Sequence, residues 1–373
     1  MSQLGKNMKK LGFGLMRLPK KGGGIDIEHT QLMVDKFLSA GFTYFDTAWS
    51  YLGSEEAIKK VLVERYPRHS YQIATKTAAW RVPSNNRVEA EAQFETSLLR
   101  TGLDYFDFYL LHNVGDERTK RFDEFNTWEF VNKKKNEGLI KHVGFSFHST
   151  AEELEQVLNN HPEMEFVQLQ INYADWENPS VQSRSCYEVA RAYKKPIIVM
   201  EPVKGGMLAN PPLAVQKILK NAAPHASFAS WGIRFAADLE GVMTVLSGMS
   251  SIEQMMDNIS YMVHFTKLTD FERQTLINAR YELSNFPIIP CTKCNYCALV
   301  CPMNIGISGT FTAVNMMILY NDREKLNTQF SWLVDGINKK YAHECIKCGK
   351  CEKVCPQHIH IRAELEKSQK ILQ

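Results

Sequence analysis

Short apolar runs alternate with longer amphipathic segments over residues 1–285 of this 373-residue chain. The apolar runs predict eight strands, at 11–16, 42–47, 71–77, 105–111, 140–146, 166–172, 196–201 and 241–247. Amphipathic segments bounded by capping and breaking residues predict intervening helices, at 27–40, from 54 onward, and at 87–101, 121–137, 150–159, 179–194, 211–221, 225–237 and 251–263. This alternation predicts parallel strands joined by right-handed crossovers, and eight such units favour an α/β fold of the (β/α)8 TIM-barrel type.

An open doubly wound sheet is the alternative architecture. That fold normally carries a glycine fingerprint that opens a helix directly after its first strand. Here Gly12-Phe13-Gly14 is followed by Leu15-Met16-Arg17 and soon by Pro19, so no helix is expected to begin there. The closed barrel is therefore the preferred prediction.

The chain is expected to contain two domains, a barrel over 1–285 and a second domain over 286–373. A helix at about 269–284 leads out of the barrel. Helical patterns at about 311–322 and 326–338 predict that the second domain is mainly helical.

Two identical cysteine runs dominate the second domain. Each reads C-x2-C-x2-C-x3-C-P, the bacterial ferredoxin spacing for a [4Fe–4S] cluster, and together they comprise Cys291, Cys294, Cys297, Cys301, Cys345, Cys348, Cys351 and Cys355. In two-cluster ferredoxins the fourth cysteine of each run binds the other cluster. We therefore expect one cluster on Cys291, Cys294, Cys297 and Cys355, and a second on Cys345, Cys348, Cys351 and Cys301.

Two other uses of cysteine compete with this interpretation. Zinc also binds C-x2-C units, but its usual sites pair two such units across a loop rather than forming complete four-cysteine runs closed by proline. A disulfide framework is expected in short secreted chains, and this chain is long and lacks a recognisable signal peptide. Two [4Fe–4S] clusters are the preferred prediction.

Composition and charge add limits on partners and location. The formal net charge is +3, which gives no reason to expect nucleic acid or an anionic membrane as a partner. No apolar run approaches the roughly 20 residues that a membrane-spanning helix needs. Thiolates that serve as iron ligands belong in a reducing compartment, so a cytoplasmic location is expected.

Four reactive side chains follow consecutive predicted strands. Asp46 and Tyr51 follow the second strand, Lys76 ends the third, and His112 ends the fourth. Barrel enzymes carry their chemistry at the carboxyl ends of the strands. Four such residues on one barrel face therefore predict a catalytic site.

With these residues in view, the sequence resembles the aldo-keto reductase family, in the branch with a ferredoxin-like tail. The stretches Gly12–Pro19 (GFGLMRLP) and Met200–Gly206 (MEPVKGG) fit that branch. The resemblance implies a tetrad of Asp46, Tyr51, Lys76 and His112 that reduces a carbonyl or oxidises an alcohol.

The chemistry of the side chains is consistent with that activity. A carbonyl that accepts a hydride also needs a proton on its oxygen, and Tyr51 is the expected acid. A cation favours a tyrosinate beside it, so Lys76 should assist Tyr51 while Asp46 holds Lys76 in place. His112 could donate a hydrogen bond that orients and polarises the carbonyl.

The resemblance further implies NAD(P)H as a cofactor. Ser146 and Gln168 would bind the nicotinamide carboxamide, and the backbone at Gly205 and Gly206 could approach the pyrophosphate. The adenosine side of the cofactor is expected near the start of the helix at 251, because helix N-termini attract anions. The candidate residues there are Ser247, Gly248 and Asn258.

The cysteine runs leave the source of the electrons open. Clusters move one electron at a time, whereas nicotinamide moves a hydride, and coupling the two usually needs a flavin. FMN or FAD in the barrel, supplied by a ferredoxin or another redox protein, is therefore an alternative to NAD(P)H. A third possibility is an electron-transfer protein in which the barrel serves as a scaffold, although the complete tetrad argues against it.

Overall fold

The computed structural model describes residues 4–5, 8–83, 86–320 and 339–372. The chain forms two compact units, one made of residues 1–202 and 230–268 and the other of 203–229 and 269–373. The domain boundary expected at 285 stays a prediction, and the helix expected at 326–338 lies outside the described residues.

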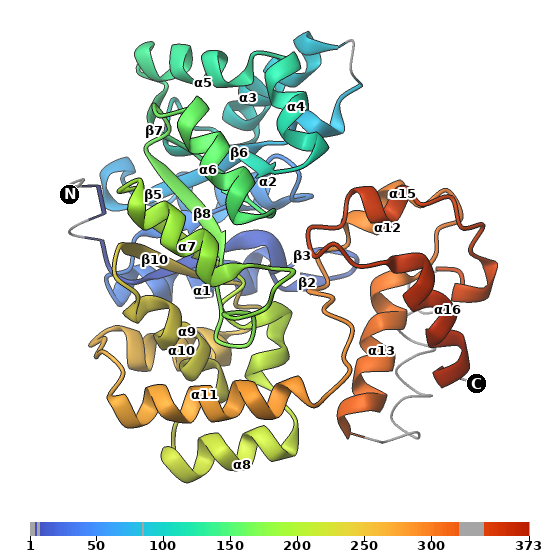
Figure 1. Cartoon of the computed structure of the whole chain (residues 1–373). Coiled ribbons are helices and arrows are strands. Elements are labelled where there is room, and N and C mark those ends of the chain that lie inside the picture. Colours follow the sequence, from blue (N-terminus) through green and yellow to red (C-terminus); the bar gives the residue numbers. More distant parts are fainter. Residues whose placement is uncertain (1–3, 6–7, 84–85, 321–338, 373) are drawn as a thin grey trace. The chain divides into compact units, whose positions relative to one another are not determined.

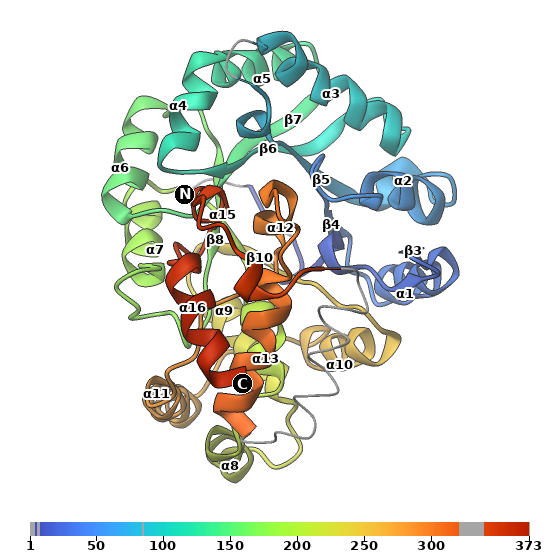
Figure 2. The ribbon, with the colours of Figure 1, turned by 90° about the vertical axis from the view of Figure 1, so that its right-hand side faces the viewer.

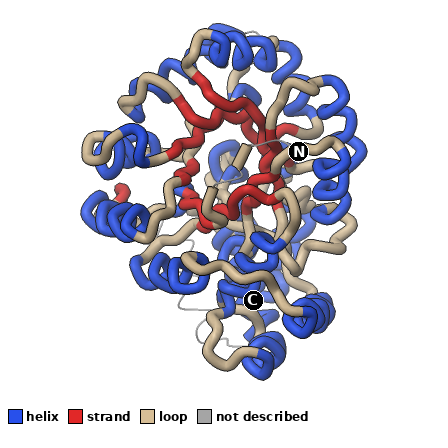
Figure 3. Tube along the Cα trace, turned by 90° about the vertical axis from the view of Figure 1, so that its left-hand side faces the viewer, coloured by secondary structure: helices blue, strands red, loops and turns tan. Residues whose placement is uncertain are grey.

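The first unit contains a closed barrel of eight parallel strands, visible as a ring in Figure 3. The barrel strands are β1 (Leu11–Gly14), β4 (Tyr44–Asp46), β5 (Gln72–Thr77), β6 (Phe106–Val114), β7 (Ile140–Phe147), β8 (Phe166–Gln170), β9 (Ile197–Met200) and β10 (Val242–Ser247). Sequential neighbours pair in parallel, and β1 closes the ring by pairing with both β4 and β10. The predicted TIM barrel is confirmed.

Helices surround this barrel (Figure 1). They are α1 (Ile27–Ser39), α2 (Ser54–Ile58), α3 (Arg87–Thr101), α4 (Glu117–Glu124), α5 (Thr127–Asn136), α6 (Ala151–Asn160), α7 (Ser183–Ala192), α9 (Phe228–Asp238) and α10 (Ile252–Met262). Local sequence explains several ends. The Asn86 side chain accepts a hydrogen bond from the Glu89 backbone at the start of α3, and Gly102 ends that helix in the left-handed conformation.

Large apolar side chains fill the barrel interior. Tyr44, Phe108 and Phe166 come from three different strands, and their rings meet edge to face with centroids 5.1 and 5.4 Å apart. Such layers of inward-facing side chains make a TIM barrel a packed core rather than a pore. The reactive groups are therefore confined to the strand ends and the loops that follow them.

Some element boundaries differ from the sequence predictions. The single helix expected at 121–137 is wrong, because Asn126 adopts a left-handed backbone (φ 49°) that separates α4 from α5. Strand β6 extends beyond the predicted end to Val114, with a register shift against β7 between Leu111 and Val114. A short hairpin, β2 (Lys20–Lys21) and β3 (Gly24–Ile25), was not predicted.

The second unit is mainly helical. It contains α8 (Leu213–Ala222) packed on α11 (Asp270–Ser284), followed by α12 (Tyr296–Val300), α13 (Ile307–Tyr320), α15 (Lys350–Lys353) and α16 (Ile361–Leu372). Figures 1 and 2 show α13 beside α16 and α12 beside α15. The predicted helical character is confirmed, whereas α16 was not predicted.

A structural repeat extends well beyond the two cysteine runs. A short helix, α12 or α15, contains the third cysteine of each run, and a longer helix begins at the equivalent residues Ile307 and Ile361. The preceding isoleucines, Ile305 and Ile359, are also equivalent, and these four isoleucines belong to one buried apolar cluster. The part of the second unit that contains the cysteines is therefore built from two similar halves. Among the described residues, no helix is long and apolar enough to cross a membrane.

Glu165 provides a pH-dependent contribution to the barrel's stability. Burial raises the pKa of this carboxyl group, but bonds from His142 Nδ1 (3.0 Å), the Lys135 ammonium and the Val143 N–H (3.0 Å) outweigh that effect and lower the pKa to about 2. The folded pKa lies below the ordinary value of 4.5, so this stabilisation is present above about pH 4.5 and is lost as the pH falls toward 2.

We predict that Glu165→Gln lowers the free energy of unfolding by about 2 kcal/mol at pH 7, and that this difference shrinks as the pH falls below 4.5. Urea unfolding of both proteins, followed by tryptophan fluorescence at pH 7, 5 and 3.5, measures it. A difference that stays constant over this range would contradict the account of Glu165.

Candidate active site and cysteine sites

A buried ion pair joins the ends of two neighbouring strands. Lys76 Nζ on β5 lies 2.5 Å from Asp46 Oδ1 at the end of β4, and it also donates a hydrogen bond to the Thr47 carbonyl oxygen at 2.7 Å. The Lys76 side chain is completely buried. Burial lowers the pKa of Lys76 and raises that of Asp46, while the attraction between the two charges opposes both shifts. The ammonium group is thereby fixed in one position.

Two of the other predicted residues lie beside this pair. The Lys76 ammonium is 5.2 Å from the centre of the Tyr51 ring. The rings of Tyr51 and His112 meet edge to face, with centroids 5.6 Å apart and planes at 82°. The structure therefore brings together all four residues that the sequence analysis placed at the strand ends.

His112 is held from two sides. Its Nδ1 lies 3.1 Å from Ser50 Oγ, and its carbonyl oxygen accepts a hydrogen bond from Trp80 Nε1 at 2.8 Å. Burial lowers the pKa of His112 well below its ordinary value, and the charge of Lys76 is the second-largest cause of this shift. The ring is therefore neutral at physiological pH. When Ser50 donates its hydroxyl hydrogen to Nδ1, Nε2 carries the ring hydrogen and is able to donate it to a ligand.

Glu55 extends the charged network behind Lys76. This buried carboxylate accepts a hydrogen bond from Thr75 Oγ1 at 2.7 Å and lies 3.4 Å from an Arg100 nitrogen. Burial raises its pKa, while Thr75 and Arg100 oppose the shift. The negative charge of Glu55 helps to keep Lys76 protonated.

A second polar cluster lies on the neighbouring strands β6, β7 and β8. Ser146 on β7 pairs in register with Gln168 on β8, and Ser146 Oγ accepts a hydrogen bond from the Asn113 N–H at 2.8 Å. Both polar atoms of the Asn113 side chain, and Oε1 of Gln168, are buried without a hydrogen-bond partner. Unsatisfied buried polar atoms are costly. Donors and acceptors of this kind fit a primary carboxamide such as that of nicotinamide.

Asn113 was not singled out in the sequence analysis. Its backbone adopts the left-handed conformation (φ 62°), which is unusual for a non-glycine residue and often marks a functional site. The sequence signal was weak, since it consists of one amide residue directly after His112.

The predicted adenosine-side residues lie at the end of β10. Asn258 on α10 donates a hydrogen bond from Nδ2 to Ser247 Oγ at 2.6 Å, and the Tyr261 hydroxyl donates to Asn258 Oδ1. A methyl group added at Gly248 would lie 3.7 Å from Arg17 Nη1, and Arg17 Nη2 lies 3.1 Å from Glu201 Oε1. Arg17 is thus a cation beside Gly248 that the sequence analysis did not assign to this position.

Gly205 and Gly206 belong to the second unit. Both have positive φ angles, 66° and 97°, as glycine readily allows. A side chain at Gly205 would lie 2.7 Å from the carbonyl oxygen of Thr292, the residue after Cys291. This close approach to the first cysteine run explains the glycine at 205, and a role for either residue at a pyrophosphate stays a prediction.

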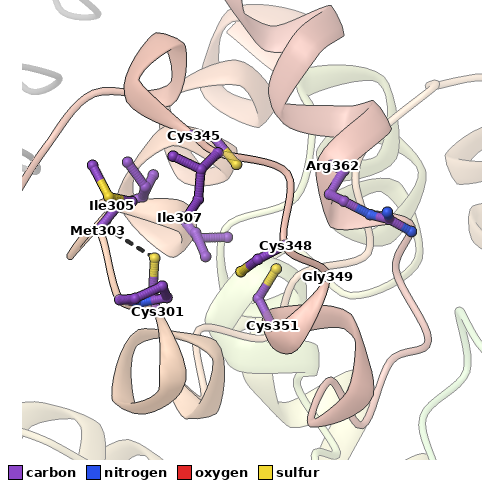
Figure 4. Close-up of a pocket in the computed structure, with 11 residues that line it drawn as sticks. Cys301, Met303, Ile305, Ile307, Cys345, Cys348, Gly349, Cys351 and Arg362 are labelled. Atoms are coloured by element: carbon purple, nitrogen blue, oxygen red, sulfur yellow. Dashed lines mark hydrogen bonds between the residues drawn. The ribbon is translucent and has the colours of Figure 1, made fainter.

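Three cysteines of the second run lie around one open cavity together with a cysteine of the first. Cys301, Cys345, Cys348 and Cys351 line this cavity along with Ile305 and Ile307. Figure 4 shows Cys301, Cys348 and Cys351 pointing toward a common space. This is the ligand set expected for one cluster, including the cysteine contributed by the opposite run.

The cysteines of the complementary set lie near Cys297, as does Cys351 of the other set. Burial raises the pKa of Cys297, and Cys294, Cys291, Cys355 and Cys351 contribute further to the same shift. None of these cysteines forms a disulfide. Cys297 and Cys355 belong to the same buried cluster of side chains.

The two runs share one backbone conformation. Left-handed residues occur at equivalent positions, at Lys293 and Lys347, at Asn295 and Gly349, and at Asn304 and His358. Such residues bend the chain tightly, so that successive N–H groups can point at sulfur. Ile305 and Lys347 donate backbone hydrogen bonds to Cys301 and Cys345 Sγ, each at 3.4 Å. Backbone donors to the ligand sulfurs are a feature of iron–sulfur sites.

Comparison with known proteins agrees with both halves of this picture. A model of the aldo/keto reductase family matches residues 10–277. The chain belongs to the aldo/keto reductase family. A model of the 4Fe-4S dicluster domain matches residues 290–360, which contain all eight cysteines of the two runs. This member of the family is therefore an oxidoreductase with an additional iron–sulfur domain.

Its relatives resemble the barrel. An aldo-keto reductase of Mycolicibacterium smegmatis is 27% identical over 262 residues, covering 68% of this chain and 83% of that protein. Methylglyoxal reductase DkgA of Yersinia pestis is 31% identical over 145 residues, which cover 39% of this chain and 47% of the relative.

Solved structures give the same fold. Aldo-keto reductase AKR11C1 of Bacillus halodurans, in its holo form, superposes with a TM-score of 0.59 at 24% identity, covering 72% of this chain and 91% of that one. An aldo-keto reductase of Klebsiella pneumoniae in complex with NADPH has a TM-score of 0.58 at 20% identity, covering 73% and 90%.

We expect the fourth cysteine of each run to bind the cluster of the other run, and this leads to a specific prediction. Cys301→Ser removes a ligand from the site that the second run builds, so we expect iron to fall from about eight to about four atoms per chain. Iron and acid-labile sulfide analysis of anaerobically purified protein measures this.

Cys186→Ser is the matched control. Cys186 is buried in α7, where burial raises its pKa to about 12, and it should leave the iron content unchanged. The opposite result would contradict the assignment of Cys301 to the second cluster. In that case Cys301→Ser would keep the cluster of Cys345, Cys348 and Cys351 and would lose the cluster of the first run.

Proposed function

We propose that this aldo/keto reductase reduces a carbonyl group, or oxidises the corresponding alcohol, by hydride exchange with NAD(P)H, with Tyr51 as the acid that protonates the carbonyl oxygen. The observation that carries the proposal is the fully buried Lys76 ammonium, bonded to Asp46 and 5.2 Å from the Tyr51 ring. A fixed cation next to a tyrosine stabilises the anion that remains after proton donation.

The other residues have distinct roles in this proposal. His112 is neutral and buried, so it would donate one hydrogen bond to the substrate oxygen and orient it beside Tyr51. Asp46 acts through Lys76 and is a positioning residue. Trp80 fixes the backbone of His112 through its hydrogen bond to the carbonyl oxygen.

The nicotinamide would be held by Ser146 and Gln168, with Asn113 beside them. When bound, NAD(P)H supplies the hydride. The unpartnered amide of Asn113 and Oε1 of Gln168 could satisfy both the carbonyl and the amino group of a carboxamide. Ser247, Gly248 and Asn258 would serve the adenosine side, and Arg17, which pairs with Glu201, lies beside Gly248. Complexes of relatives with NADPH support this choice of cofactor.

The eight cysteines would hold two [4Fe–4S] clusters, which transfer single electrons. The match to a dicluster domain also supports a second candidate function, in which the barrel holds FMN or FAD and receives electrons from a carrier protein. In that case the tetrad would still protonate the substrate, but the hydride would come from the flavin.

We predict that Tyr51→Phe lowers kcat for reduction of a test aldehyde by about 10²–10⁴-fold, because general acid catalysis contributes that much. The iron content and absorption spectrum should not change. Anaerobic steady-state assays with NADPH measure the effect.

Tyr281→Phe serves as the control for loss of a tyrosine hydroxyl, since Tyr281 is 73% exposed on α11. Its kcat should equal that of the unmodified protein. Full activity of Tyr51→Phe would contradict the assignment of the acid.

A further inference from the structure

One cysteine of the dicluster domain reaches the surface. Of the eight cysteines in the two runs, Cys348 is the exposed one, whereas Cys297, Cys351 and Cys355 are buried and the other four are partly buried. Electron exchange between proteins requires close approach, so the surface at Cys348 is where a second protein could come nearest to a sulfur ligand. We call the exposed residues Ile346, Lys347, Cys348, Lys350 and Lys353 the Cys348 face.

We propose that the Cys348 face is the docking surface for an acidic one-electron carrier protein. This inference rests on the proposed electron-transfer role of the cysteine domain, and it adds the entry point and the kind of partner. The transfer itself moves one electron from the reduced carrier to this protein, with no bond formed and no proton required.

One member of the face is apolar. Ile346 is 59% exposed, although it also lines the cavity that Cys301, Cys345, Cys348 and Cys351 share. A large apolar side chain at the rim of that cavity is available for burial by a partner. Interfaces between proteins commonly bury apolar side chains and surround them with polar ones.

The face is positively charged. Lys350 and Lys353 occupy both ends of the short helix α15, on either side of Cys351 and Glu352. In the part of the chain that the structure describes, neither lysine forms an ion pair. Lys347 does pair with Glu366 at 3.2 Å, but both side chains are more than 60% exposed, so the pair is weak. These ammonium groups therefore remain available to a partner.

Charge along the chain supports an acidic partner. Residues 339–370 contain eight Lys and Arg but four Asp and Glu, whereas the whole chain has 44 and 41. The segment that contains the second cysteine run therefore carries a local excess of positive charge. A positive patch steers negatively charged proteins toward it and raises their association rate.

The test uses the full-length, cluster-containing protein and an acidic plant-type ferredoxin as the probe. In the variant Lys350→Glu with Lys353→Glu, we expect the Kd measured by calorimetry at low ionic strength to rise by about tenfold. The control, Lys36→Glu with Lys217→Glu, changes net charge equally at exposed lysines far along the chain from the cysteines, and its Kd should stay within about twofold. Iron content should be equal in all three proteins.

Rapid-mixing kinetics give a second readout. Reduction by the reduced ferredoxin should be slower in the Lys350/Lys353 variant, while reduction by dithionite, a small reagent, should not change. Added salt should weaken ferredoxin binding to the unmodified protein.

Three outcomes would overturn the proposal. One is absence of ferredoxin binding to the unmodified protein, and another is equal weakening in both double variants, which would show an effect of net charge alone. The third is equally tight binding of single-stranded DNA, which would mark the face as a general polyanion surface. Carbonyl reduction is measured in a separate assay. Ferredoxin binding can therefore be interpreted even if the proposed reduction at Tyr51 is not found.

Discussion

The catalytic proposal depends on the buried pair between Lys76 and Asp46. Placing both charges out of water is costly, and removing one partner from such a pair commonly destabilises a protein by about 3–5 kcal/mol. A buried ion pair with that energetic cost is expected to serve either the specificity of the fold or the chemistry of a site. Here the ammonium group lies 5.2 Å from the Tyr51 ring, whose other neighbour is the neutral ring of His112. The charge and the hydrogen-bond donor that carbonyl reduction needs are therefore both present beside one tyrosine.

The iron–sulfur domain is organised as a structural repeat. Its two cysteine runs have left-handed residues at equivalent positions. Each run contains a short helix and is followed by a longer one, and equivalent isoleucines of both halves pack in one apolar cluster. Such an arrangement allows the fourth cysteine of each half to serve as a ligand at the site of the other half. Cys301 indeed lies in the cavity of the second run. Under the predicted cross-ligation, each site would depend on the folding of the opposite half.

Much of this could be predicted from the sequence because the signals were periodic or chemically specific. Alternating strands and helices indicated the barrel, and the cysteine spacing indicated the dicluster domain. The features that could not be predicted from the sequence depend on single residues. Asn126 breaks one expected helix through a left-handed backbone, and the orphaned amide of Asn113 is visible only once β6 and β7 are in register. Gly205 illustrates a different limit, since its contact with Thr292 joins segments almost 90 residues apart.

Whether the hydride comes directly from nicotinamide is the central question for this member of the family. The most direct measurement supplies NADPH carrying deuterium on the transferred position at C4, together with a simple aldehyde, under anaerobic conditions. Direct transfer at the Tyr51 site predicts one deuterium on the new carbinol carbon of the product alcohol, detected by mass spectrometry. Product alcohol without deuterium, formed through a carrier that exchanges with solvent, would contradict the account and favour a flavin fed through the cysteine domain.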